Sequence, residues 1–354
     1  MKLYVIIMLA VWEPAVFSAT QQPDYLTLLG QGRAEYRSGH FASAETLLTD
    51  ALAKLGGSNE TLRANMLGNL GDVYASQEEY SKAARAYSES LTIYRRLPDK
   101  SASALMLHNL GMLYSIQGQD EEGLRNLTQA IELLKSVPKV DVSLTAQLLN
   151  GVGIVHYRQG KNKKAEASFN QALQMVSKAG VPFDTGGILH NLGAVYVAQR
   201  KFKEAEDVLK RALQIRETEV GPSHPDLINT LNALGDLCVE TGRYAEAEDR
   251  YRWALKILAP LSLDFAPTMA RLLHALGVTY MRAGRHADSD ALLAQAADIA
   301  RSNLNKEPEM ATILDDYSAI LKNQGKTKEA EELHMQAKRA RAAAGLVIRA
   351  FTAW

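Results

Sequence analysis

Small residues and leucines recur along the chain at intervals of about 40 residues. In the stretch 232–251, NALGDLCVETGRYAEAEDRY, the small residue Gly235 serves as an anchor for comparison with the rest of the chain. The same pattern occurs in eight copies, in steps of 39, 40, 42, 40, 42, 42 and 41 residues, anchored at Gly32, Gly71, Gly111, Gly153, Gly193, Gly235, Gly277 and Ser318. Each copy has leucine four residues before the anchor and no residue larger than serine twelve residues after it. A ligand-binding glycine loop occurs once per site, so this recurrence indicates a packing pattern.

The spacing within each copy predicts two amphipathic helices. In the sixth copy the first helix places Leu231, Leu234 and Cys238 on the face of the anchor Gly235, three or four residues apart. The second helix has its own apolar face, made of Tyr244, Ala247, Tyr251, Ala254 and Leu255. Residues 241–243 form a turn between them, so each copy is a short helical hairpin.

The small anchor allows the two helices of a hairpin to approach closely. Glycine in a helix costs about 1 kcal/mol relative to alanine, so packing must return more than that. We expect Gly193 to face the second helix of its hairpin near Ala205, and a leucine at position 193 to overpack the hairpin. Alanine at position 193 is the milder change, and it stabilises the protein if the gap accepts one methyl group.

These residues carry a resemblance to a known family. The small anchor, the tyrosine three residues later in several copies and the paired alanines, such as Ala205 with Ala212, resemble the tetratricopeptide repeat over about residues 24–340. The long step, and "GPSHPD" at 221–226, are similar to the repeats of kinesin light chains and their bacterial relatives. The resemblance implies an all-α, right-handed superhelical α-solenoid of about eight helix-turn-helix repeats in one elongated domain.

In the resembling family the first helix of each repeat lines a concave groove that binds peptides. The positions that face it lie 6, 3 and 2 residues before the anchor and 1 after, and an asparagine there holds peptide main chain through its amide. The predicted peptide-binding residues are Asn65, Asn69, Asp72, His108, Asn109, Asn150, His190, Asn191, Asn229, Asn232, Asp236 and His274. Gly151, Ala233 and Ala275 interrupt the asparagine ladder. In the alternative interpretation, the asparagines only hydrate an exposed helix face.

Enzyme chemistry finds no support in the motifs. The stretch GKT at 325–327 lacks the upstream glycine of a phosphate loop and occupies a hairpin turn, and Cys238 takes an apolar helix position. His108, His190 and His274 share one repeat position but stand two repeats apart, too far to bind one metal ion, so we interpret them as solvated groove residues. The sequence therefore predicts no enzyme activity, no cofactor and no metal, with an unrecognised active site as the alternative.

Composition and charge limit the classes of partner that the chain can bind. With 40 basic and 40 acidic residues the chain has no net charge to attract nucleic acid. Residues 341–354 combine basic and apolar side chains, which fits the end of a capping helix or a tail, with membrane-surface binding as the alternative. We expect no stable membrane span.

The N-terminus has the pattern of a signal peptide over residues 1–18. Lys2 precedes an apolar run from Leu3 to Trp12, and Ser18 and Ala19 are small residues suited to cleavage. The sequence thus predicts export to the periplasm or the medium; an uncleaved membrane anchor and a buried N-terminal cap are the alternatives.

Together these features favour a non-enzymatic protein-protein interaction scaffold that binds a protein or peptide segment in the groove. A structural or assembly factor, acting through self-association or envelope attachment, is the alternative.

Overall fold

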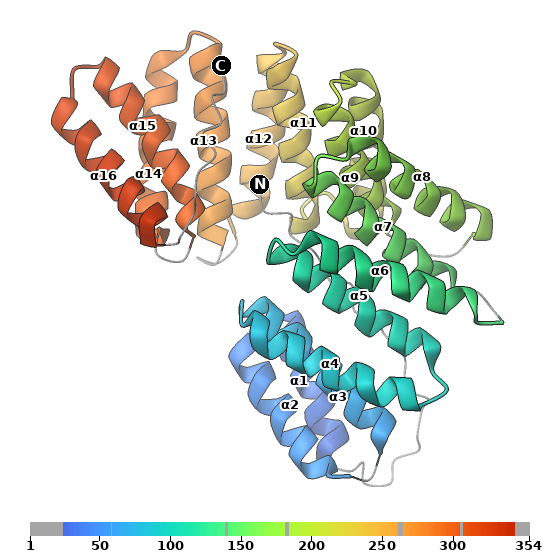
Figure 1. The fold of residues 1–354 in the computed structure, drawn as a ribbon. Coiled ribbons are helices and arrows are strands. Elements are labelled where there is room, and N and C mark those ends of the chain that lie inside the picture. The colour runs from blue at the N-terminus through green and yellow to red at the C-terminus, as the bar shows by residue number, and fades with distance from the viewer. Residues whose placement is uncertain are drawn as a thin grey trace. The chain divides into compact units, whose positions relative to one another are not determined.

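The chain folds into a series of antiparallel helical hairpins (Figure 1). The computed structural model describes residues 24–57, 59–138, 141–180, 184–260, 265–304 and 307–343. Within these ranges it contains sixteen α-helices and no β-strand. The predicted all-α fold of paired helices is therefore confirmed. The predicted signal peptide at 1–18 and the tail from 344 onward lie outside the described residues.

The hairpins group into two compact units, and the boundary in the chain falls between Asp184 and Thr185. The helices of the first unit are α1 (Asp24–Arg37), α2 (Phe41–Leu55), α3 (Glu60–Ser76), α4 (Tyr80–Arg96), α5 (Lys100–Ile116), α6 (Asp120–Lys135), α7 (Val142–Arg158) and α8 (Asn162–Ala179). Those of the second are α9 (Thr185–Ala198), α10 (Phe202–Val220), α11 (Ile228–Glu240), α12 (Tyr244–Leu258), α13 (Ala266–Arg282), α14 (His286–Asn303), α15 (Ala311–Asn323) and α16 (Thr327–Ala343), with 3₁₀ turns at Pro225–Leu227 and Pro308–Met310. That all eight repeats form one continuous solenoid stays a prediction.

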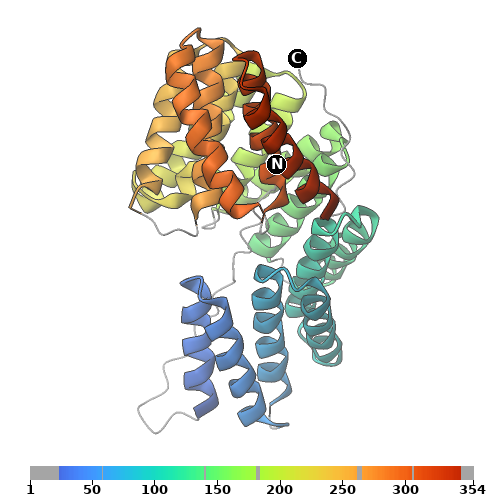
Figure 2. The same ribbon diagram turned by 90° about the vertical axis from the view of Figure 1, so that its left-hand side faces the viewer.

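Each repeat consists of an odd-numbered helix A followed by an even-numbered helix B. Within each unit, helices that are consecutive in the chain pack against each other, as the hairpins in the two views show (Figure 2). The A helices also contact the A helix of the next repeat, as α5 contacts α7 and α11 contacts α13. One face of each unit is therefore built from A helices.

Local signals set where the helices begin and turn. The side chains of Asn59, Asp99 and Asp141 accept hydrogen bonds from the backbone N–H three residues later, which caps α3, α5 and α7. The hairpin turns require a left-handed residue, and Gly242 with φ +74° supplies it between α11 and α12. Pro267 lies in the first turn of α13, where a missing N–H leaves no helical bond unmade.

The anchor residues pack as the recurring pattern predicts. All eight residues twelve positions after an anchor are buried. In the third repeat a Cβ added to Gly123 would lie 2.8 Å from the carbonyl oxygen of Gly111, and Ser289 Oγ donates to the carbonyl of Gly277 at 2.8 Å. The interpretation that small residues allow close helix approach is confirmed.

A second partner of the anchor was not predicted. A Cβ added to Gly193 would lie 2.6 Å from Cγ and Cδ2 of Leu209, one turn beyond the expected neighbour Ala205. In the other repeats with a glycine anchor the residue at this position is also large: Leu48, Tyr87, Leu127, Phe169, Tyr251 and Leu293. Each glycine anchor therefore accommodates a bulky core side chain of helix B.

Polar contacts on the B side join neighbouring repeats. Glu206 on α10 accepts two hydrogen bonds of 2.9 Å from the guanidinium of Arg243, and Glu248 on α12 accepts one of 2.8 Å from Arg285. The hydrogen bonds from Arg243 lower the pKa of Glu206 to about 2. These contacts link the B helices α10, α12 and α14 of neighbouring repeats.

Candidate functional site

The predicted groove residues of α3 form a small hydrogen-bonded chain. The Nη2 atom of Arg33 on α1 donates to Oδ1 of Asn65, and the amide of Asn69 donates to the same oxygen at 3.1 Å. Both asparagines are half-buried. The side chain of Asn65 therefore links α3 to α1 through Arg33, while Asn69 bonds within its own helix.

A buried polar cluster lies between α3, α4 and α5. Asp72 Oδ1 accepts hydrogen bonds from the hydroxyl of Tyr87 at 2.7 Å and from the amide of Asn109 at 3.2 Å. Nδ1 of His108 lies 3.1 Å from the amide oxygen of Asn109. Burial raises the pKa of Asp72 to about 7, against the hydrogen bond from Tyr87, and lowers the pKa of His108.

This cluster corrects the prediction for one histidine. His108 is 4% exposed, so it is not a solvated groove residue. The next A helix packs closely here because Gly151 on α7 has no side chain, and a Cβ at that position would lie 3.1 Å from the sulfur of Met112 and 3.5 Å from Nε2 of His108. Asp72 and Asn109 are also buried, and their polar atoms are hydrogen-bonded to each other.

The remaining predicted residues, apart from Asn150, lie in the second unit. His190 on α9 lies with Nδ1 3.4 Å from the hydroxyl of Thr230 on α11. The loss of hydration around the half-buried ring, together with nearby Arg216, lowers the pKa of His190 to about 4. Asn150 in the first unit and Asn191 in the second are half-buried, and Asn229 is exposed.

Asp236 on α11 repeats the contact made by Asp72. Its Oδ1 accepts a hydrogen bond of 2.6 Å from the hydroxyl of Tyr251, and its Oδ2 accepts one of 3.0 Å from the amide of Asn232. Unlike Asp72, this residue is exposed. Surrounding protein atoms replace part of its hydration and raise its pKa, while the hydrogen bond from Tyr251 opposes that rise.

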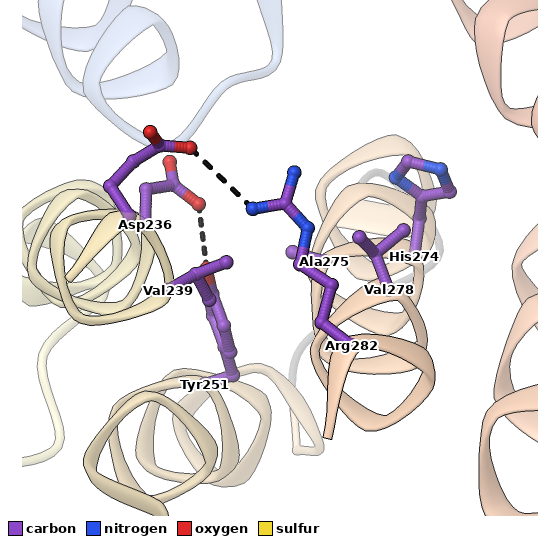
Figure 3. Close-up of a pocket in the computed structure, with 8 residues that line it drawn as sticks. Asp236, Val239, Tyr251, His274, Ala275, Val278 and Arg282 are labelled. Atoms are coloured by element: carbon purple, nitrogen blue, oxygen red, sulfur yellow. Dashed lines mark hydrogen bonds and ion pairs between the residues drawn. The ribbon is translucent and has the colours of Figure 1, made fainter. Parts of the chain in front are cut away.

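A hollow of about 250 Å³ opens beside Asp236 on the A-helix face. Its lining comes from α11, α12 and α13 and comprises Asp236, Val239, Glu240, Tyr251, His274, Ala275, Val278 and Arg282. Figure 3 shows Asp236 and Val239 on one side and Ala275, Val278 and Arg282 of α13 across from them. Arg282 Nη1 lies 3.6 Å from Glu240, and His274 pairs with Asp316 on α15 at 2.9 Å.

The sequence indicated only part of this hollow. Asp236 and His274 were predicted groove residues, and Ala275 was placed at a groove position as a break in the asparagine ladder. The sequence-based prediction did not include Val239, Glu240, Val278 and Arg282. Glu240 and Arg282 each lie five residues after an anchor, one helical turn beyond the groove position at plus one, so helix periodicity could have found them. Tyr251 was predicted as a core residue, and its hydroxyl reaches the hollow from the buried side.

Three other features were expected to be absent or inert: a metal site, a reactive thiol and a membrane span. Across it, no three His, Cys, Asp or Glu side chains are placed to hold a metal ion. Cys238 is buried, as predicted, and burial raises the pKa of its thiol. Among the helices that the structure describes, none has both the length and the hydropathy needed to cross a bilayer.

The comparison with protein families identifies the repeat. The model of the tetratricopeptide repeat family matches residues 24–96, 101–178, 184–259 and 268–343, two hairpins in each match. These matches cover most of the chain, which therefore belongs to the tetratricopeptide repeat family, as the sequence predicted.

Two solved structures are similar in fold, and one curated protein is similar in sequence. The Rap conjugation gene regulator of the plasmid pLS20, solved in complex with the Phr* peptide, is 17% identical with a TM-score of 0.60, covering 94% of this chain and 98% of that one. BtubC (BKLC) from P. vanneervenii is 22% identical with a TM-score of 0.58, covering 64% and 92%. Photosystem I assembly protein Ycf3 of Rippkaea orientalis is 22% identical over 135 residues, 38% of this chain and 72% of that protein.

Proposed function

We propose that this chain is a non-catalytic interaction scaffold that binds an extended protein segment along the A helices of its second unit, α9, α11 and α13. The observation that carries the proposal is the hollow beside Asp236, which lies at the A-helix positions where the family resemblance places the groove. An open recess with polar groups beside apolar walls is the usual form of a recognition site.

The side chains around the hollow suit an extended backbone. Asn229 is exposed and Asn232 is half-buried, and both lie on α11. An amide can donate to a peptide carbonyl and accept from a peptide N–H at the same time. The Rap regulator of pLS20, which has a similar fold, was solved with a bound peptide, and this supports a peptide partner for the present chain as well.

Site-specific crosslinking tests where a segment binds. A photo-crosslinking amino acid at position 229, exposed on helix A, is expected to form adducts with a degenerate decapeptide library. The same amino acid at position 207, where Asp207 is exposed on helix B (α10), is the matched control and is expected to form few. Equal labelling at the two positions, or labelling at 207 alone, would remove the groove from the proposal.

The assembly alternative is tested by molecular mass. A scaffold that captures a segment is expected to keep one mass from low to high micromolar concentration. A mass that rises with concentration would favour the assembly factor instead.

Export is a separate proposal that rests on the N-terminal sequence. The apolar run from Leu3 to Trp12, followed by the small residues Ser18 and Ala19, is expected to be removed by the cell. Mass spectrometry of the native protein should find a chain that begins near Ala19. A chain that keeps Met1 in the cytoplasmic fraction would contradict export.

A further inference from the structure

The repeats contain the same aspartate–tyrosine pair twice, in two different settings. Asp72 and Tyr87 are joined by a hydrogen bond of 2.7 Å, and Asp236 and Tyr251 by one of 2.6 Å. In both repeats the aspartate follows the anchor glycine directly, and the tyrosine comes fifteen residues later. The two carboxyl groups can therefore be compared within one chain.

In the first unit the next A helix closes the site. Asn109 on α5 donates its amide to Asp72 at 3.2 Å and leaves that residue 4% exposed. The equivalent position on α13, two residues before the anchor Gly277, is Ala275. The side chain of alanine has no hydrogen-bond donor and is shorter than that of asparagine. The hollow therefore opens beside Asp236, at the place where the amide of Asn109 contacts Asp72 in the first unit (Figure 3).

The basic groups around the hollow pair with other carboxylates. His274, which lowers the pKa of Asp236, pairs with Asp316. The positive charge of Arg33 favours the ionised form of Asp72, whereas among the described residues no lysine or arginine forms an ion pair with Asp236. Glu240 adds a further negative charge and raises the pKa of Asp236. The one guanidinium that lines the hollow, that of Arg282, lies toward Glu240.

The walls fit an aliphatic chain. Val239, Ala275 and Val278 present methyl groups to the hollow. Its volume of about 250 Å³ is below the roughly 300–1,000 Å³ of small-molecule sites and suits a single side chain. Lysine and arginine combine a methylene stem, which packs on apolar walls, with a charged donor at the tip.

We propose that the hollow binds a lysine or arginine side chain of the partner segment, whose charged N–H group donates to Asp236 as the amide of Asn109 donates to Asp72. This inference rests on the proposed function, because the basic side chain belongs to the bound segment. A segment with an acidic residue at this point would be repelled by Asp236 and Glu240. The hollow thus selects the sequence of the segment, while the amides of α11 contact its backbone.

Binding of defined peptide pools to the full chain tests the inference. The probes are four degenerate N-acetylated decapeptide pools whose central residue is lysine, arginine, norleucine or glutamate, with the other positions free of charged residues. The lysine and arginine pools are expected to bind at least tenfold more tightly than the norleucine pool, because a charge-assisted hydrogen bond forms only with them. The glutamate pool should bind most weakly.

Two variants and a control place the preference in the hollow. Asp236→Asn removes the charge, and Ala275→Asn supplies the amide that closes the site in the first unit; each is expected to abolish the tenfold preference. Asp207→Asn removes an exposed charge on α10, and this variant should keep the tenfold preference for the basic pools. Circular dichroism checks that each variant is folded.

The outcomes separate this inference from the proposed function. If the four pools bind the wild-type chain equally well, the inference fails and the scaffold function stands. If no pool binds, both fail. A preference that survives both Asp236→Asn and Ala275→Asn in folded protein would place basic recognition elsewhere and overturn the inference.

Discussion

Replacing Gly193 with alanine is expected to destabilise the fifth repeat, although alanine is the better helix former. Gly193 lies on α9 with its Cα against α10, and an added Cβ would lie 2.6 Å from Cγ and Cδ2 of Leu209. Leu209 is fully buried, so its side chain has little room to move. The added methyl group must displace either the leucine or the helix.

The size of the effect follows from two opposing contributions. Overpacking of a tight core costs roughly 1–3 kcal/mol, and replacing glycine with alanine inside a helix returns about 1 kcal/mol. The expected net loss for Gly193→Ala is therefore up to about 2 kcal/mol. Helix propensity alone would let Gly193→Ala stabilise the protein, whereas the contact with Leu209 predicts a loss of stability.

Gly30→Ala is the matched control. Gly30 is exposed on α1, and nothing lies within 4 Å of a Cβ at that position. The same substitution there gains the propensity without the clash, so it should stabilise its hairpin by about 0.5–1 kcal/mol. Urea unfolding followed by circular dichroism, with hydrogen exchange of α9–α10 and α1–α2 peptides, measures the two effects separately.

A double-mutant cycle tests the identity of the partner. Leu209→Ala alone opens a cavity and costs about 2–5 kcal/mol, but it also makes room for the new methyl group. The combined variant should therefore lose less than the sum, by about 0.5–3 kcal/mol. Equal stabilisation by Gly193→Ala and Gly30→Ala, with strictly additive losses in the cycle, would refute the close contact.

Two further predictions concern the buried cluster of the first unit. Because folding raises the pKa of Asp72 from 3.8 to about 7, its contribution to stability is complete below about pH 4 and is lost as the pH rises through 7. Asp72→Asn should therefore remove roughly 4 kcal/mol of the change in unfolding free energy between these pH values. Parallel pH profiles of wild type and variant in urea unfolding would contradict this prediction. Asn109→Ala should cost about 1–3 kcal/mol, because the buried Asp72 loses the amide donor of Asn109 and keeps the hydroxyl of Tyr87. Asn69→Ala at its half-buried position should change the melting temperature little, and equal losses would show that burial does not separate these sites.

Asn69, Asn109 and Asn191 share one repeat position, and the sequence predicts all three as groove residues. The structure separates them, because Asn109 is buried in contact with Asp72. The alanine variant of Asn109 therefore tests stability as well as binding. Asn69 is half-buried, so its alanine variant tests binding in the groove.

The period of the sequence determined the repeats by itself. Helix faces depend on residues three and four apart, and a hairpin depends on residues twelve apart, so the anchors, the leucines before them and the small residues after them can be read without a structure. The family and the helix-pair fold follow from these local offsets. Burial of Cys238 followed from the same periodicity.

The tertiary structure decided which polar residues are closed and which are open. Asp72 and Asp236 occupy the same repeat position and carry the same tyrosine partner, yet one is buried and the other lines a hollow. The difference comes from the residue that the next A helix places opposite, Asn109 or Ala275, and from how closely that helix packs. Such a contact joins residues about 40 positions apart and depends on side-chain volume at the interface. The helical periodicity of either segment alone therefore does not predict it.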